Sequence, residues 1–122
     1  MAEPACAVRG IRGATTVEKN EAELIYAATQ ELLVEIIKKN NFSADDIAAA
    51  LFSTTEDLNS AFPARAAREM GWHSVPLFCS QEIDVPGALG LCIRVLLLVN
   101  TTLRQDQVKH IYLRKAVNLR KL

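Results

Sequence analysis

Hydrophobic positions recur with two different periods in the first third of the chain. Val8–Val17 (VRGIRGATTV) is rich in β-branched residues and predicts a strand, whose glycines indicate a bulge or a close approach by another element. From Asn20 to Asn40 the apolar side chains instead recur at helical spacing. We expect Asn20 to cap this long helix, with Glu23 completing a capping box. The expected buried stripe is Ile25, Ala28, Leu32, Leu33 and Ile36.

The middle of the chain predicts a strand and a short helix. Ile47–Thr54 (IAAALFST) is apolar and short, which favours a central strand. After a polar loop, Phe62 and Pro63 open a short helix that runs through Met70, with Gly71 at its C-terminal end. Arg65 and Arg68 are three apart and share one helix face, where solvation is the default interpretation.

The last third is strand-rich. Val75–Val99 predicts two strands joined by a turn, and Lys109–Leu113 (KHIYL) predicts a final one. Residues 1–7 are expected to be a loose N-terminus and residues 115–122 a short basic tail that extends the last strand. The element order predicts an α+β fold with a five-stranded β-sheet, one long helix and one short helix. One long helix covers one sheet face well, so the uncovered face predicts oligomerisation.

Two charged residues, Glu82 and Arg94, lie in the most apolar stretch of the sequence. An unpaired charge in a protein interior costs several kcal/mol, so each side chain needs a partner or water. A bound anion is one partner for Arg94. A structural Glu82–Arg94 pair, or strand ends that reach water, is the other explanation, and the spacing leaves both open.

Composition narrows the class of protein. The 122 residues are enough for a single domain, and 14 basic against 14 acidic residues argue against general nucleic-acid binding. Residues 85–122 nevertheless hold 7 basic side chains and one acid, which suits a small anionic ligand. Three widely spaced cysteines suggest reduced thiols and no zinc site. With no signal pattern and no apolar run near the ~20 residues that span a membrane, we expect a cytoplasmic protein.

Five segments in order resemble one known family. They are RGIRGATTVE (9–18), FPARAAREMGW (62–72), VPLFCSQEIDVPGAL (75–89), CIRVLLLVNT (92–101) and HIYLRKAVNLR (110–120). Together they resemble the monofunctional chorismate mutases of the trimeric, non-helical class, over the whole chain after residue 7. The resemblance implies a mixed sheet and a homotrimer that forms a pseudo-α/β-barrel, with active sites at the subunit interfaces.

The resemblance also implies the reaction, the rearrangement of chorismate to prephenate in phenylalanine and tyrosine biosynthesis. This pericyclic shift needs no metal, cofactor or covalent intermediate, so the enzyme supplies orientation and preorganised charge. By the resemblance Arg94 is catalytic at the breaking ether oxygen, and Glu82 is catalytic at the ring hydroxyl. Arg12 binds the substrate from the first strand, Cys79 contacts the ring hydroxyl, and the Tyr112 hydroxyl binds a substrate carboxylate.

The resemblance assigns further substrate-binding positions. Phe62 and Arg68 come from the adjacent subunit, whereas Arg65 and Arg120 lie at the entrance and guide the dianion. The others, next to Cys79 in sequence, are Phe78, Ser80 and Gln81.

Two departures from the family pattern affect these expectations. Phe78 stands where a smaller polar residue can occur, which puts the local shape of the site in question. Only a short segment follows Arg120, which puts closure of the site in question. His73 and His110 are expected to be structural or exposed, because pericyclic chemistry needs no proton shuttle.

Two other functions use the same arginines. One is a non-catalytic trimeric sensor of a small carboxylic acid such as an amino acid, in which Glu82 has no reason to face the ligand. The other is a different trimeric enzyme, such as an imine hydrolase. For the mutase we expect Glu82 and Arg94 to face a common cleft, held apart by the substrate and not joined to each other.

Overall fold

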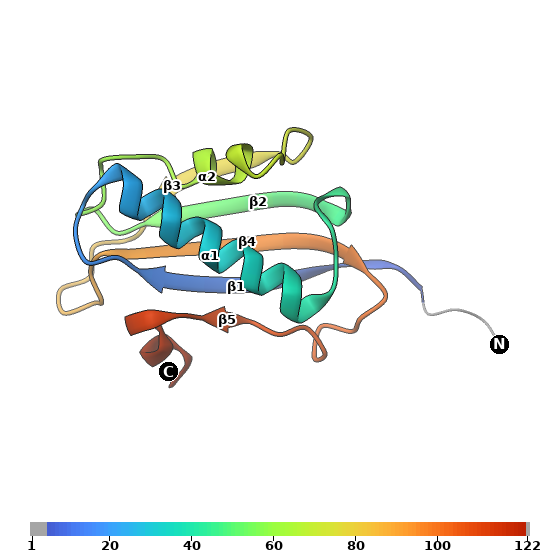
Figure 1. Cartoon of the computed structure of the whole chain (residues 1–122). Coiled ribbons are helices and arrows are strands. Elements are labelled where there is room, and N and C mark those ends of the chain that lie inside the picture. The colour runs from blue at the N-terminus through green and yellow to red at the C-terminus, as the bar shows by residue number, and fades with distance from the viewer. Residues whose placement is uncertain (1–4, 122) are drawn as a thin grey trace.

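The chain folds into one five-stranded sheet with a long helix packed on one of its faces (Figure 1). The computed structural model describes residues 5–121, with side chains up to residue 119. In chain order the elements are β1 (Ala7–Thr16), α1 (Ala22–Asn40), a 3₁₀ helix (Ala44–Asp46), β2 (Ile47–Thr54), α2 (Ala64–Glu69), β3 (Leu77–Gln81), β4 (Cys92–Thr101), β5 (Ile111–Tyr112) and a C-terminal 3₁₀ helix (Arg114–Lys121).

The sheet is mixed, in the order β3-β2-β4-β1-β5. β4 lies in the centre and runs antiparallel to β1 and β2, whereas the two edge strands β3 and β5 run parallel to their neighbours. The predicted α+β class and five-stranded sheet are therefore confirmed. β1 pairs with β4 in an unbroken register from Ala7 to Thr16, so the glycines of β1 mark close packing and not a bulge.

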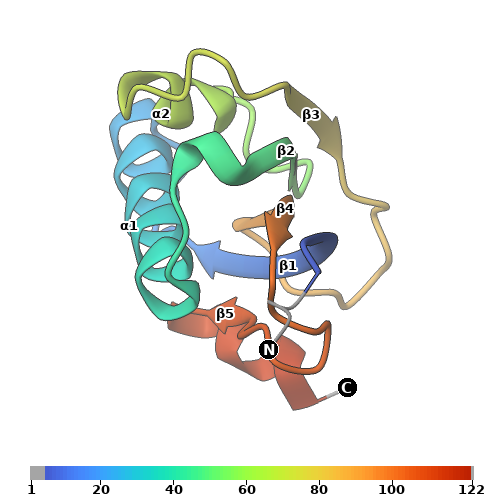
Figure 2. The ribbon, with the colours of Figure 1, turned by 90° about the vertical axis from the view of Figure 1, so that its right-hand side faces the viewer.

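The core lies between the sheet and α1. Alternate residues of β4, from Ile93 to Val99, face the buried stripe of α1 predicted from its spacing. The opposite sheet face carries half-buried or exposed apolar side chains, including Leu51, Leu96 and Leu98. Figure 2 shows α1 on one side of the sheet and no helix over the middle of the other. The expectation of one uncovered face is confirmed for the described residues.

Three expectations about where elements begin or end were wrong. The first strand begins at Ala7, inside the predicted loose N-terminus; residues 1–4 lie outside the described range. α1 begins at Ala22 after Glu21, with no side-chain cap. Asn20 instead accepts the backbone N–H groups of Asn59 and Ser60 at 3.1 Å, because the loop before α2 offers it two donors.

The third concerns the basic tail, which does not extend the last strand. It turns into a 3₁₀ helix at Arg114, whose φ of 53° ends the extended backbone. β5 is correspondingly only two residues long. The tail packs Ala116 against Ala14 and Cys92 and so covers one end of the otherwise open face. None of the helices within residues 5–121 has the length and hydrophobicity to cross a bilayer.

Candidate active site

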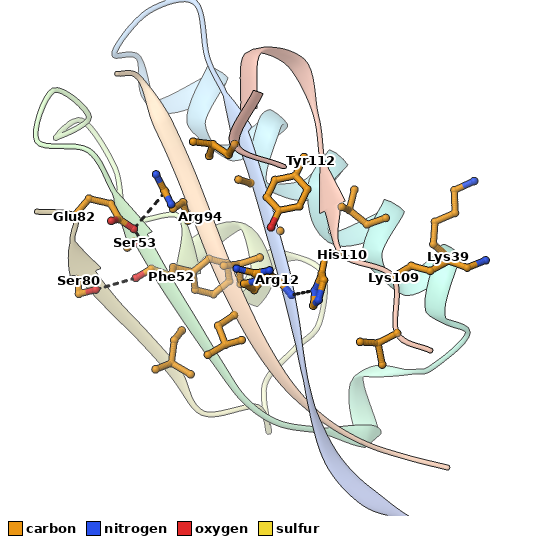
Figure 3. A pocket seen from close by; sticks show the side chains of 18 residues that line it. Arg12, Lys39, Phe52, Ser53, Ser80, Glu82, Arg94, Lys109, His110 and Tyr112 are labelled. Carbon is orange, nitrogen blue, oxygen red and sulfur yellow. Dashed lines mark hydrogen bonds and ion pairs between the residues drawn. The ribbon is translucent and has the colours of Figure 1, made fainter. Parts of the chain in front are cut away.

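A single row of residues across all five strands forms the floor of a cleft on the open face. The pairing places Ser80 beside Ser53, Ser53 beside Arg94, Arg94 beside Ala14, and Ala14 beside Tyr112. All five line one open cleft of about 820 Å³, a volume in the range of ligand sites (Figure 3). Strand periodicity accounts for this, because directly paired residues point to the same side of a sheet.

Arg12 and Glu82 join the row by the same periodicity. Arg12 is two residues before Ala14 on β1, and Glu82 is two residues after Ser80, just past the end of β3. A backbone hydrogen bond from Glu82 N–H to the Thr54 carbonyl, at 2.8 Å, fixes Glu82 there. Among the described residues that line the cleft, four are cationic and one is acidic, so the cleft suits an anionic ligand. The cations are Arg12, Lys39, Arg94 and Lys109.

Glu82 and Arg94 form an ion pair, with 3.6 Å between Glu82 Oε1 and Arg94 Nε. The expectation that they are not joined was therefore wrong for the single unliganded chain. The side chains of Glu82 and Arg94 are only 29% and 41% exposed, so water screens the two opposite charges incompletely and they attract each other at close range. Both residues line the cleft, so a molecule bound there can contact the pair.

The Arg94 atom of this ion pair, Nε, makes no hydrogen bond, because its 3.6 Å distance to Glu82 Oε1 is too long for one. Arg94 Nε is buried, and no acceptor among residues 5–119 has hydrogen-bond geometry to it. The same Glu82 oxygen, Oε1, accepts a hydrogen bond from the Ser53 hydroxyl. Sequence reasoning missed Ser53, because a serine at the end of an apolar strand carries no pattern of its own. Arg94 is therefore oriented, charged and short of one acceptor.

A second cleft of about 670 Å³ lies on the other side of β3, against α2 and the loop before it. Five further predicted positions line it, with Ser80 shared by both clefts: Phe62, Arg65, Arg68, Cys79 and Gln81. In the single chain Cys79 thus lies away from the Glu82 cleft. Phe62 is 70% exposed, which is high for so large an apolar side chain.

One described position of the predicted set, Phe78, is in neither cleft. Phe78 is 63% exposed and lies beside Leu51 on the open face. The side chain of Arg120 lies outside the described part of the chain. Cys92 is buried behind the cleft, and burial raises the pKa of its thiol although the charge of Arg94 opposes this, so the thiol is neutral. Cys92 is a core residue, as predicted.

The family is decided by the comparison with protein families. The family described as chorismate mutase type I matches residues 8–121, nearly the whole sequence. The chain belongs to this family. Chorismate mutase activity, an isomerase activity, is the function that this membership gives it.

Individual relatives agree with the family. The chain is 54% identical over 114 residues to chorismate mutase AroH of Thermus thermophilus, covering 93% of each sequence. It is 50% identical over 114 residues to chorismate mutase AroH of Bacillus subtilis, covering 93% of this chain and 90% of that one. A solved chorismate mutase from Clostridium thermocellum has a TM-score of 0.88 and 52% identity, covering 89% of this chain and 97% of that structure. Nothing in these matches favours the non-catalytic sensor.

Proposed function

We propose that this chorismate mutase converts chorismate to prephenate with Arg94 and Glu82 as its catalytic residues. The observation that carries the assignment is the Arg94–Glu82 pair in a cationic cleft, in which Arg94 Nε lies 3.6 Å from Glu82 Oε1 and has no hydrogen-bond acceptor among the described residues. Chorismate is a dicarboxylate with a breaking ether bond, and the ether oxygen gains negative charge in the transition state. A hydrogen bond from a preorganised donor to that oxygen is stronger in the transition state than in the ground state, so it lowers the barrier.

In this proposal the substrate replaces the direct Glu82–Arg94 contact. Released from Glu82, the Arg94 guanidinium donates to the ether oxygen, while Glu82 accepts a hydrogen bond from the ring hydroxyl and faces developing positive charge on the ring. Arg12 and Tyr112 bind carboxylate oxygens from β1 and β5, because a guanidinium fork and a hydroxyl both suit that group. Bonds break and form within the substrate, so no protein atom is covalently modified.

We propose further that the enzyme is a homotrimer whose active sites combine two subunits. The predicted site residues occupy two separate clefts of one chain, so one copy does not bring Arg68 and Phe62 to Arg94. The exposed apolar side chains Leu51, Phe62 and Phe78 flank these clefts. Docking the second cleft of one subunit over the first cleft of the next buries these side chains and completes the site. A cytoplasmic location stays a prediction from the cysteine pattern.

The proposal is tested by following the loss of chorismate absorbance with wild-type protein and Arg94→Ala. Wild type is expected to convert chorismate without added metal or nucleotide. Arg94→Ala is expected to lose about 100- to 1,000-fold in kcat, as when one oxyanion donor is removed. Folded wild-type protein that turns over chorismate at the uncatalysed rate would contradict the function. A fully active Arg94→Ala would contradict the assignment of Arg94 alone.

A further inference from the structure

Side chains, more than strand pairing, complete the outer edge of β1. β5 pairs with β1 only at Ile111 and Tyr112. Further along the same edge, the Gln105 side chain accepts the Gly10 N–H at 2.9 Å and donates to the Gly10 carbonyl at 2.6 Å. Between these two contacts the Arg12 N–H donates to His110 Nδ1 at 2.9 Å. Each side chain replaces a backbone partner that a longer β5 would supply.

His110 connects the strands that carry two proposed substrate-binding residues. It is two residues before Tyr112, lines the same cleft, and binds the backbone of Arg12 itself (Figure 3). The backbone just before it is also fixed, since Asn40 accepts the Lys109 N–H at 2.7 Å and donates to the Lys109 carbonyl at 2.9 Å. The imidazole of His110 therefore follows a backbone segment that Asn40 holds in place, and it contacts the backbone of Arg12.

We propose that His110 is a positioning residue for the chorismate mutase reaction. By accepting the Arg12 N–H, it fixes the spacing between the Arg12 guanidinium and the Tyr112 hydroxyl. The substrate carboxylates are bound across that spacing, and misplacing a binding group by about 1 Å can cost up to ~100-fold in rate. This inference rests on the proposed roles of Arg12 and Tyr112, and it gives His110 no proton to transfer.

The contact requires a neutral imidazole, because a protonated Nδ1 donates and no longer accepts. Burial lowers the pKa of His110, and the positive charge of Arg12 lowers it further. The other titratable groups that line the cleft with it are Lys39, Glu82, Arg94, Lys109 and Tyr112. The hydrogen bond is therefore present at pH 7 and is lost only as the pH falls below the ordinary histidine range. Acidification should then weaken substrate binding through His110.

The test measures kcat/KM for chorismate in His110→Asn and His110→Leu. The Asn side-chain oxygen can occupy the place of Nδ1 and accept the same N–H, whereas Leu cannot. We expect about a tenfold or larger loss in kcat/KM for His110→Leu, mainly as a raised KM, and near-complete rescue in His110→Asn. His73→Leu is the matched control, because His73 is exposed and lies in neither cleft; its kcat/KM should equal that of wild type.

Two further measurements separate positioning from general stability. In an Arg12→Ala background, the loss caused by His110→Leu should shrink, because the residue then has no guanidinium to position. Below pH 6.5, wild type should lose an acid-sensitive part of kcat/KM that His110→Asn lacks, and this comparison does not depend on the Leu variant folding. Equal losses in both backgrounds, or His110→Asn as impaired as His110→Leu, would overturn the inference. Inactive wild type would instead overturn the proposed function.

Discussion

At the scale of single residues, Arg94 explains how a charge is tolerated in an apolar strand. Its side chain is 41% exposed and paired with Glu82, so it is not isolated in the interior. Ser53 donates a hydrogen bond to the same Glu82 oxygen that Arg94 Nε faces, and Arg94 Nε itself has no hydrogen-bond acceptor among the described residues. Of the two explanations that the sequence left open, the ion pair is observed, and it lies in the cleft that we propose as the ligand site.

The guanidinium shape should matter as much as its charge. Arg94→Lys keeps the charge but replaces a planar fork by a point charge on a flexible stem, so we expect at least a ~100-fold loss in kcat. Arg104→Lys is the control, because Arg104 is exposed and pairs only with Asp106 on the far connection. Steady-state kinetics on both variants provide the measurement. Equal activity of Arg94→Lys and wild type would show that net charge alone suffices.

At the scale of elements, the sequence predicted what periodicity controls. The strands and the buried stripe of α1 follow from local spacing and are confirmed. The errors occurred where distant segments compete for the same group. Asn20 serves a loop about 40 residues away instead of its own helix, and the tail packs on Ala14 instead of extending β5. No local pattern records such contacts.

The site was predictable to a similar extent. Family resemblance gave the residues, and strand alternation explains why Ser80 and Glu82 share a cleft. Neither revealed the contacts of Ser53 and His110, because each is one hydrogen bond to a residue 29 or 98 positions away. The closing of Glu82 on Arg94 was also missed, since it depends on side-chain torsions that no sequence pattern specifies.

The packing of β1 on α1 gives a prediction about stability. A Cβ added at Gly13 would lie 2.6 Å from Ile36 Cδ1 and 3.2 Å from both Leu32 Cδ1 and Val95 Cγ1. Since three core side chains crowd that point, we expect Gly13→Ala to lower the free energy of unfolding by about 1–3 kcal/mol. At Gly10 the nearest atom is 3.4 Å away, so Gly10→Ala should be close to neutral. Urea unfolding measures the free energy of unfolding of both variants. Equal values for Gly13→Ala and Gly10→Ala would contradict the crowding at Gly13.

At the scale of the whole molecule, the two clefts separate the proposed site into complementary halves. Arg94 lies in the first cleft and Arg68 in the second. If neighbouring subunits combine these halves, a protein in which either arginine is replaced lacks one half of every site. A mixed oligomer nevertheless contains some interfaces where both halves are native.

Mixing inactive Arg94→Ala with inactive Arg68→Ala should therefore restore activity. After unfolding and refolding together, random assembly places native halves at about a quarter of the interfaces, so we expect about a quarter of wild-type kcat. Each variant refolded alone is the control, and light scattering gives the number of subunits. Mixed samples as inactive as their components, with confirmed subunit exchange, would show that one chain supplies the whole site.

The alternation of β3 also restricts how this protein can change length during evolution. Cys79 and Gln81 serve one cleft while Glu82 serves the other, so parity along the strand decides which site receives which side chain. An insertion or deletion of one residue between α2 and β3 that shifted the strand would exchange the two sets. Such length changes can survive only when the loop from Gly71 to Pro76 absorbs them before Leu77 pairs with Ala50.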